Sequence, residues 1–320
     1  MTLQRSRNAL LAALACALTL CASGAFAESI NPPTKPQLSP AMTPAERANL
    51  DMVLEWWRVV LEGGYLGETG KYQATDYIQH NPNLPTGQAA FVNFFKNVIK
   101  MPQAPVVPAW LNDPPVVAGA KGDFVFLIFE HEAPHPTQAG DTYHWNSFEV
   151  LRIQNGKVQE HWDSFQRQPL PAGAPPRDWA QPAWQHARGS LGTLSALERQ
   201  NLAVATRELK DLLQYGHLEM ADQVLAEGYI QHNPRVPQGR AGFVEFMSAN
   251  PNRKPLPIKD EWINPPGLTI TSGPYVVMMW ERKSPDPETG KDYSWTHFDV
   301  MRVEDGVVQE HWDEAVLAAQ

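Results

Sequence analysis

The sequence predicts an α+β fold that occurs twice along the chain, with helices first and an antiparallel sheet after them. Three observations predict it. The hexapeptide YIQHNP occurs at residues 77–82 and again at 229–234. Apolar residues at helical spacing precede each copy. Short apolar runs and Asn-Gly or Asp-Gly turns follow each copy, as in β-hairpins.

The repeat extends well beyond the hexapeptide. At an offset of 152 residues, TPAERANL (43–50) matches SALERQNL (195–202), and GQAAFVNF (87–94) matches GRAGFVEF (239–246). At an offset of 150, FEVLRIQNGKVQEHWD (148–163) matches FDVMRVEDGVVQEHWD (298–313). A period of about 150 residues is the length of a domain, so the chain is predicted to be a duplication and not a solenoid.

The N-terminus has the pattern of a secretory signal peptide. Arg5 and Arg7 precede an apolar run, and Ala25-Phe26-Ala27 fits a cleavage site after Ala27. We therefore expect a signal peptide at 1–27, an extended lead-in at 28–41, a first domain at 42–166, a Pro/Ala-rich linker at 167–193 and a second domain at 194–316. The expected location is periplasmic or secreted, with no membrane attachment after processing.

Composition excludes several classes of function. Both cysteines, Cys16 and Cys21, lie in the predicted signal peptide, so the processed chain has no disulfide, cysteine nucleophile or thiolate ligand. The signal peptide contains two basic residues and no acidic one, which leaves 24 basic and 35 acidic residues and a net charge of −11. Nucleic acid is not expected as a partner, because phosphate binding needs basic patches.

The predicted elements follow the same order in each half. Thr43 with Glu46, and Ser195 with Glu198, fit capping boxes that begin the first helix. A second, shorter helix is expected before each YIQHNP, and a third after Gly87 and Gly239. Buried strands are expected at 124–129 and 275–280. Hairpins are expected at 143–163 and 293–313, turning at Asn-Gly and Asp-Gly.

Two carboxylates at matching places on the predicted hairpins are candidate acid–base groups. Glu149 shares a strand face with Trp145, and Asp299 shares one with Trp295 and His297. A carboxylate on an apolar cavity wall gains a raised pKa, which suits a general acid or base. The alternative is a structural ion pair with Arg152, Arg302 or another basic residue across the sheet.

The EHWD segments and the hexapeptide add further candidates. His161 and Asp163, like His311 and Asp313, share one strand face, and an Asp can orient a His. Trp162 and Trp312 are on the other face, and the sequence leaves open which face lines a cavity. For the His and Asn of the hexapeptides, turn and capping chemistry is the alternative to a role in binding or catalysis. The two tyrosines could equally be core aromatics with a satisfied hydroxyl. The hexapeptide candidates are Tyr77, His80, Asn81, Tyr229, His232 and Asn233.

No metal, cofactor or nucleotide site is expected. His131, His135 and His144 gather in the first half, but Arg282 and Ser294 take the corresponding places of His131 and His144 in the second. A metal site central to function would be expected in both copies. Neither H-E-x-x-H nor a dinucleotide or phosphate-binding fingerprint occurs.

YIQHNPNLPTGQAAFVNFF, followed by a strand that ends in FEVLRIQNGKVQEHWD, resembles the SnoaL-like, polyketide cyclase-type branch of the nuclear transport factor 2-like superfamily. Both halves resemble it. The resemblance implies two tandem cone-shaped domains, each with helices packed on a strongly curved antiparallel sheet around an apolar cavity. It also implies acid–base catalysis without a cofactor. The positions that match the family's polar cone residues are His80, Glu149, His161, Asp163, His232, Asp299, His311 and Asp313.

The resemblance leads to a functional expectation with alternatives. We expect an aldol condensation, cyclase or isomerase type of enzyme that acts on a small apolar carbonyl compound. A non-catalytic periplasmic module that binds a small ligand is the main alternative, and a purely structural pairing module is another. The family's domains pair through their sheets, so the two halves are expected to form a pseudo-dimer within one chain. Glu149 in place of the usual Asp, and Ser147 opposite His297, predict unequal halves and favour the second.

Overall fold

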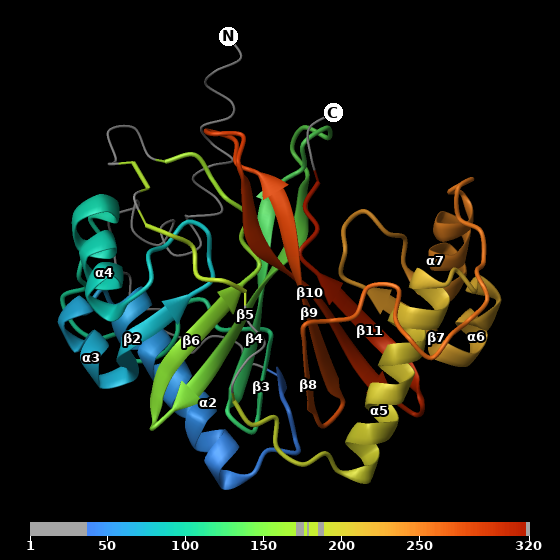
Figure 1. The fold of residues 1–320 in the computed structure, drawn as a ribbon, viewed down its shortest axis with the longest axis horizontal. Coiled ribbons are helices and arrows are strands. Elements are labelled where there is room, and N and C mark those ends of the chain that lie inside the picture. Colours follow the sequence, from blue (N-terminus) through green and yellow to red (C-terminus); the bar gives the residue numbers. More distant parts are fainter. Residues whose placement is uncertain (1–36, 171–175, 178, 185–188, 318–320) are drawn as a thin grey trace.

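The structure is a computed structural model that describes residues 37–170, 176–177, 179–184 and 189–317. The predicted signal peptide and most of the predicted lead-in lie outside the described residues. Each half contains helices packed on one sheet, which confirms the predicted α+β class (Figure 1). Among the described residues, no helix combines the length and the apolar character that crossing a membrane requires.

The first half begins with strand β1 (Gln37–Leu38) and helix α2 (Pro44–Trp56), which continues as the π-helical segment η2 (Trp57–Glu62). The short helices η3 (Leu66–Glu68) and α3 (Thr69–Tyr72) lead into strand β2 (Gln73–Gln79). Helix α4 (Gln88–Asn93) continues as η4 (Phe94–Ile99). The remaining strands are β3 (Val117–Lys121), β4 (Phe124–Pro134), β5 (Thr142–Gln154) and β6 (Lys157–Asp163).

The second half repeats this order from helix α5 (Ala196–Thr206) and its continuation η5 (Arg207–Gln214). Helices η6 (Leu218–Met220) and α6 (Ala221–Val224) lead into strand β7 (Leu225–Gln231), and helix α7 (Gly239–Ser248) follows. Strands β8 (Leu268–Ser272), β9 (Tyr275–Pro285), β10 (Asp292–Glu304) and β11 (Val307–Asp313) complete it. The sheet orders are β1-β3-β4-β5-β6-β2 and β7-β11-β10-β9-β8. Only β1, β2 and β7 pair in parallel.

Local sequence signals for the helix starts and hairpins are confirmed. Thr43 and Ser195 each accept a hydrogen bond from the backbone of the glutamate three residues later, and that glutamate bonds back to the cap. Asn155 and Asp305 begin the β5–β6 and β10–β11 turns with φ of 52° and 53°. A glycine with positive φ follows each of them, so both turns have the left-handed backbone that two-residue hairpins favour.

The hexapeptide differs from its predicted setting. The helix before it is only four residues long, and strands β2 and β7 then include Tyr77 to Gln79 and Tyr229 to Gln231. Side chains alternate along a strand, so the Tyr and the Gln share one face, and both are buried in each half. Periodicity could not reveal this strand, because polar residues occupy its buried positions.

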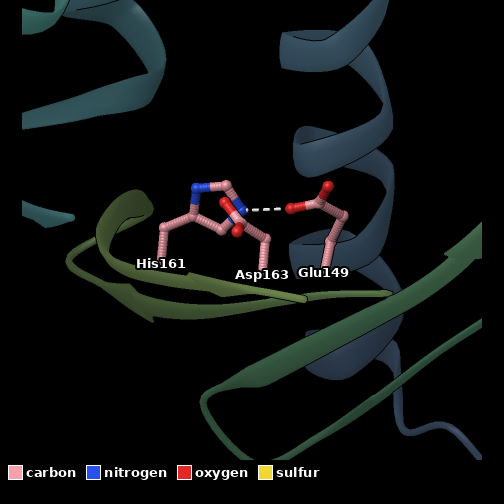
Figure 2. A group of neighbouring side chains, drawn as sticks. All are labelled: Glu149, His161 and Asp163. Atoms are coloured by element: carbon pink, nitrogen blue, oxygen red, sulfur yellow. Dashed lines mark hydrogen bonds and ion pairs between the residues drawn. The ribbon is translucent and has the colours of Figure 1, made fainter. Parts of the chain in front are cut away.

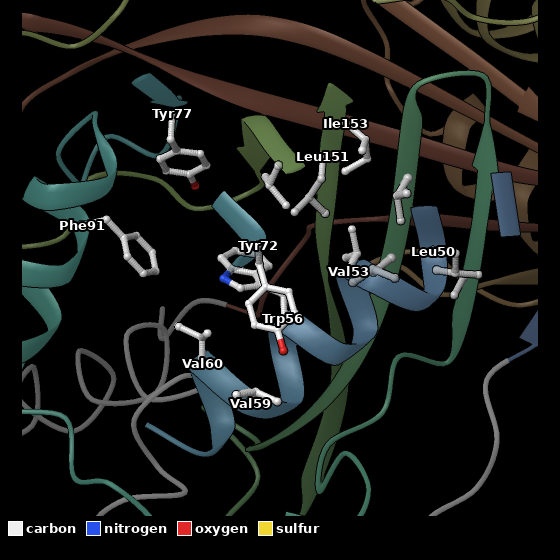
Figure 3. Packing of buried hydrophobic residues seen from close by; sticks show 14 of the residues in the cluster. Leu50, Val53, Trp56, Val59, Val60, Tyr72, Tyr77, Phe91, Leu151 and Ile153 are labelled. Carbon is white, nitrogen blue, oxygen red and sulfur yellow. The ribbon is translucent and has the colours of Figure 1, made fainter. Parts of the chain in front are cut away.

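Two kinds of core hold the molecule together. In the first half, α2 packs Leu50, Val53 and Trp56 against Leu151 and other residues of the sheet (Figure 3). A second apolar cluster is shared by the two sheets, which face each other while the helices lie outside (Figure 1). In that cluster Phe148 of β5 stacks on Phe298 of β10, with ring centroids 5.5 Å apart. The opposite face of each sheet is left to face its own helices.

Candidate functional site

The pairing of β5 with β6 brings three polar residues of the first half together. Glu149 pairs with Asp163, and Leu151 pairs with His161, so all four side chains share one face. Leu151 lies in the core beneath α2, whereas Phe148 lies between the sheets. The polar residues therefore face the helices, which answers the question that the sequence left open. Figure 2 shows the three side chains rising from the sheet on the side of α2.

Hydrogen bonds fix this first cluster, which consists of Glu149, His161 and Asp163. The Nε2 of His161 is hydrogen-bonded to Oε2 of Glu149 (Figure 2). Its Nδ1 lies 3.0 Å from the hydroxyl of Tyr77. Asn81 donates from Nδ2 to Oδ2 of Asp163 over 2.8 Å. The three residues of the cluster are at most 5% exposed, so they are removed from bulk water.

Burial keeps the first cluster close to neutral. It raises the pKa of Glu149 well above its usual range and lowers the pKa of His161 to about 4. Burial, and then the neighbouring Glu149, raise the pKa of Asp163 to about 7. Burial thus favours the protonated form of Glu149 and leaves His161 neutral at pH 7, while Asp163 exchanges its proton near that pH. Two buried carboxyl groups in different surroundings suit an acid and a base.

The second half builds the corresponding cluster from Asp299, His311 and Asp313. Asn233 donates to Oδ2 of Asp313 over 2.8 Å, as Asn81 does in the first half. Nε2 of His311 lies 3.0 Å from Oδ1 of Asp299. Each cluster of three could offer ligand atoms to a metal ion, since these atoms lie within 4.8 Å of one another.

The neighbours of the second cluster are charged. Nδ1 of His311 lies 3.0 Å from Oε1 of Glu208. Nε2 of His297 lies 3.1 Å from Oδ2 of Asp299, and its Nδ1 is bonded to Glu314. The repeat aligns these charged neighbours with uncharged residues of the first half. Glu208, His297 and Glu314 correspond, in that order, to Trp56, Ser147 and Ser164.

These neighbours reverse the protonation pattern. Burial alone would lower the pKa of His311, but Glu208 and Asp299 raise it well above its usual range. Asp299 and Glu314 likewise overcome burial and raise the pKa of His297 to about 10. Although burial opposes it, the two histidines hold the pKa of Asp299 below its usual range. The second cluster is therefore an ionic network, in which the carboxylate of Asp299 lies between two cationic imidazoles.

His80 and His232, which the resemblance groups with the cluster residues, lie on the opposite face. His80 stacks on Trp162 with ring centroids 4.8 Å apart, and its Nε2 lies 2.8 Å from Oε1 of Glu160. His232 repeats this with Trp312 at 4.4 Å and with Glu310 at 3.0 Å. Residues adjacent on a strand point to opposite faces, so the histidines are separated from the clusters by the sheet.

The remaining candidates fall on both faces. Arg152 and Arg302 bind Glu160 and Glu310, whereas Glu149 and Asp299 pair with the histidines of the neighbouring strand, His161 and His311. Trp145 packs on His131, with ring centroids 4.4 Å apart. Trp295 makes an edge contact with His297. Trp162 and Trp312 lie in the apolar cluster between the sheets, away from both polar clusters.

Sequence reasoning missed four residues that shape the clusters. Gln79 and Gln231 donate to the hydroxyls of Tyr77 and Tyr229, over 2.8 and 3.1 Å. Glu208, which also accepts from the Tyr229 hydroxyl, and Glu314 supply the second half's extra negative charge. The signal for Glu208 was present in the sequence, because the repeat aligns this charged residue with the apolar Trp56.

The family comparison concerns the second half directly. Residues 206–311, from the end of α5 to β11, match the family model described as the SnoaL-like domain. The second half is therefore similar to the SnoaL-like domain over these residues. The match covers about a third of the chain, and the first half is linked to the SnoaL-like domain by the repeat and by the shared strand order.

Solved structures with similar folds each align with little more than a third of the chain. A candidate polyketide cyclase from Acidithiobacillus ferrooxidans has 18% identity and a TM-score of 0.26, and covers 38% of this chain and 89% of its own. A candidate SnoaL-like polyketide cyclase from Jannaschia sp. CCS1 has 16% identity and a TM-score of 0.26, with coverages of 38% and 88%. A candidate ketosteroid isomerase from Kribbella flavida has 21% identity and a TM-score of 0.25, with coverages of 38% and 82%.

Identities and TM-scores this low carry no argument about what the chain does. A search of the curated proteins returns no match. The function is therefore argued from the clusters themselves.

Proposed function

We propose that the first half is the centre of an acid–base enzyme that acts on a small carbonyl compound, in keeping with the cyclase or isomerase type of the SnoaL-like family. One observation carries the proposal: Asp163, held by Asn81, has a pKa of about 7 beside a protonated Glu149 in a buried cluster. A general base is most effective when its pKa lies near the working pH.

The geometry suggests how the roles divide. The carboxylate of Asp163 removes a proton from the carbon next to a carbonyl group. Burial favours the protonated forms of Glu149 and Tyr77. A neutral His161 accepts a hydrogen bond from one of them, and the O–H of the other is the donor for the oxygen on which negative charge develops. His161 bridges Glu149 and Tyr77 and positions both. The chemistry proposed for these side chains uses no cofactor.

The matched residue pair Asp163 and Asp313 provides the test. Purified protein is mixed in heavy water with ketones, 1,3-dicarbonyls and esters, and deuteration at the α-carbon is followed by NMR. We expect exchange whose rate rises with pH through about 7. Asp163→Asn should lower the rate about 100-fold or more, while Asp313→Asn leaves most of it. Loss on Asp313→Asn alone would move the chemistry to the second half.

A ligand-binding module is the second candidate, and the enclosure of the first cluster favours it. Glu149, His161 and Asp163 are polar groups set in an apolar interior, and a few such groups suffice to fix the orientation of a small ligand. In that case, deuteration at the α-carbon is no faster with the protein than in buffer alone for any compound, and a ligand stays with the protein through purification.

We further propose that the chain works outside the cytoplasm after cleavage following Ala27, a proposal supported by the N-terminal sequence pattern. We also propose that the halves act as an intrachain pseudo-dimer. The apolar cluster between the sheets and the buried bond from Lys121 to Glu198, at 2.8 Å, support this second proposal. Amino-terminal sequencing of the secreted protein tests the first, and separate expression of each half tests the second.

A further inference from the structure

The second cluster has a feature that acid–base chemistry does not use. The carboxylate of Asp299 lies between two imidazoles and meets the Nε2 atom of each. The distances are 3.0 Å to His311 and 3.1 Å to His297. Asp313 completes the group, with ligand atoms of Asp299, His311 and Asp313 within 4.8 Å of one another. The ligand atoms of three residues thus converge from strands β10 and β11, and His297 contacts the other oxygen of Asp299 beside them.

A glutamate supports the other nitrogen of each imidazole. Nδ1 of His311 lies 3.0 Å from Oε1 of Glu208, and Nδ1 of His297 is bonded to Glu314. Metal-binding histidines usually donate their second ring N–H to a carboxylate, which fixes the tautomer and makes Nε2 a better ligand. Carboxylate ligands are themselves usually hydrogen-bonded, as Asp313 is by Asn233 and by the backbone of Ala315.

An independent observation concerns Glu208. Its side chain is completely buried, and among the described residues its Oε2 has no hydrogen-bond partner. Burying a carboxylate with one free oxygen is costly unless positive charge lies close to it. The His311 imidazole, 3.0 Å from Oε1 of Glu208, is the group that can carry such charge, either as a cation or with a metal ion on its Nε2.

The first half lacks these features. Its His161 has Tyr77 and Gln79 at Nδ1 in place of a carboxylate. A serine, Ser147, takes the place of His297. The two halves therefore differ in the chemistry that each can hold.

We propose that the second half binds one divalent transition-metal ion through Asp299, His311 and Asp313, with His297 completing the site beside Asp299. Imidazole and carboxylate donors without a thiolate suit Zn²⁺, Co²⁺, Ni²⁺, Mn²⁺ or Fe²⁺. Glu208 and Glu314 are positioning residues that orient the two imidazoles. This site lies in the half that the proposed acid–base function does not use, so either proposal stands without the other.

The sequence predicted no metal, because the histidines weighed there were His131, His135 and His144. None of these belongs to the site. The fourth member of the proposed site, His297, has no histidine counterpart in the first half, so a comparison of the two copies would not reveal it. The duplication has left room for one copy to acquire ligands that the other lacks.

The test measures metal directly. Untagged protein is stripped with a chelator, and Co²⁺ is added while its visible absorption and the bound metal are measured. We expect one Co²⁺ per chain, displaced by Zn²⁺. His311→Gln combined with His297→Ser should weaken binding at least 100-fold, whereas His161→Gln leaves it unchanged. His217→Gln, which alters a histidine paired with Glu219 outside the cluster, is the second control.

Glu208→Gln separates a positioning role from a purely structural one. It should weaken Co²⁺ binding 10- to 100-fold and leave the shape of the absorption spectrum unchanged, because the ligands themselves remain. If the double variant fails to fold, anomalous scattering from wild-type crystals grown with Zn²⁺ gives the position of the ion. Less than 0.2 equivalents in the wild type, binding that survives the double variant, or an ion elsewhere would overturn the proposal.

Discussion

The two halves share a hexapeptide, an EHWD strand and a sheet topology, yet their polar clusters differ in charge. In the first half, Glu149 is protonated and His161 is neutral within a closed apolar environment. In the second half, Asp299 is ionised and His311 is cationic. The shared motif places the side chains, but it does not set their protonation.

Three neighbours account for the difference, since Trp56, Ser147 and Ser164 of the first half correspond to Glu208, His297 and Glu314 of the second. Trp56 meets the His161 ring edge-on with centroids 6.3 Å apart, where Glu208 meets His311 with a carboxylate. A tryptophan removes water without adding charge, so it favours neutral forms, whereas a glutamate favours a cationic histidine. Changes outside the motif thus give the two clusters different charges, which suits the proton transfer proposed for one half and the cation binding proposed for the other.

The largest expected effect is on the chemistry of the first half. Replacing its apolar neighbour by the second half's residue, Trp56→Glu, should raise the pKa of His161 and let it protonate at pH 7. An ionic pair with Glu149 would then replace the neutral one, and α-deuteration should fall at least 10-fold. The control Trp56→Phe keeps the environment apolar and should retain most of the activity. Equal activity of the two variants would contradict the role given to Trp56.

The next effect concerns a buried ion pair that only one half provides. Lys121 reaches both carboxylate oxygens of Glu198 across the interface, at 2.9 and 2.8 Å, whereas Ser272 takes the corresponding place in the second half. Lys121→Met leaves the Glu198 charge buried, which should cost about 3 kcal/mol in unfolding free energy. Ser272→Ala should cost about 1 kcal/mol. Urea unfolding measures both, and an unchanged midpoint for Lys121→Met would sink the claim.

A smaller effect, on stability, depends on pH. It concerns two corresponding side chains, one in each half, that accept a hydrogen bond from the backbone of a later loop. Glu62 accepts from the backbone of Asn112, as Gln214 accepts from Asn264. Burial raises the pKa of Glu62 from 4.5 to about 7. As the pH rises, the unfolded chain releases this proton before the folded protein does. The contribution of Glu62 to stability is therefore complete below about pH 4.5 and declines up to about pH 7.

Glu62→Gln gives the first half the residue of the second and should remove that decline. Relative to the wild type, the variant should gain on the order of 1–2 kcal/mol between pH 4.5 and pH 7.5, after allowance for partial solvent exposure. Urea midpoints measured at both pH values test this. A difference between variant and wild type that is the same at both pH values would show that Glu62 is ionised throughout.

The smallest effect should be equal in the two halves. Thr43 and Ser195 cap corresponding helices with the same two hydrogen bonds. Thr43→Ala and Ser195→Ala should each cost about 1 kcal/mol. Thermal unfolding of the two variants measures the costs. A difference larger than about 1 kcal/mol would mean that one half unfolds before the other and that the halves are not coupled.

The sequence predicted the parts of the fold that depend on neighbouring residues. The capping boxes of Thr43 and Ser195, the turns at Asn155 and Asp305 and the long strands were all predicted, because each follows from neighbouring residues. The expected faces of the β5 and β6 strands also appear in the structure, since alternation needs only a strand.

The site was harder to predict because it depends on register and on distant neighbours. The prediction that His80 lies with the cluster was wrong. Strand β2 continues to Gln79, and the next residue, His80, then packs against Trp162 on the opposite face of the sheet. Glu208 approaches His311 from 103 residues away, and only the sheet and helix packing brings them together. No local pattern predicts such a contact, although the repeat did mark Glu208 as different from Trp56.

One measurement tests the central claim most directly, namely that the same histidine has opposite protonation in the two halves. Protein with ¹⁵N-labelled histidine is kept in chelator, and the ring nitrogen shifts of His161 and His311 are recorded at pH 7, with His161→Gln and His311→Gln used for assignment. The account predicts a neutral imidazole at His161 and a doubly protonated one at His311. The same protonation state at both positions would contradict it.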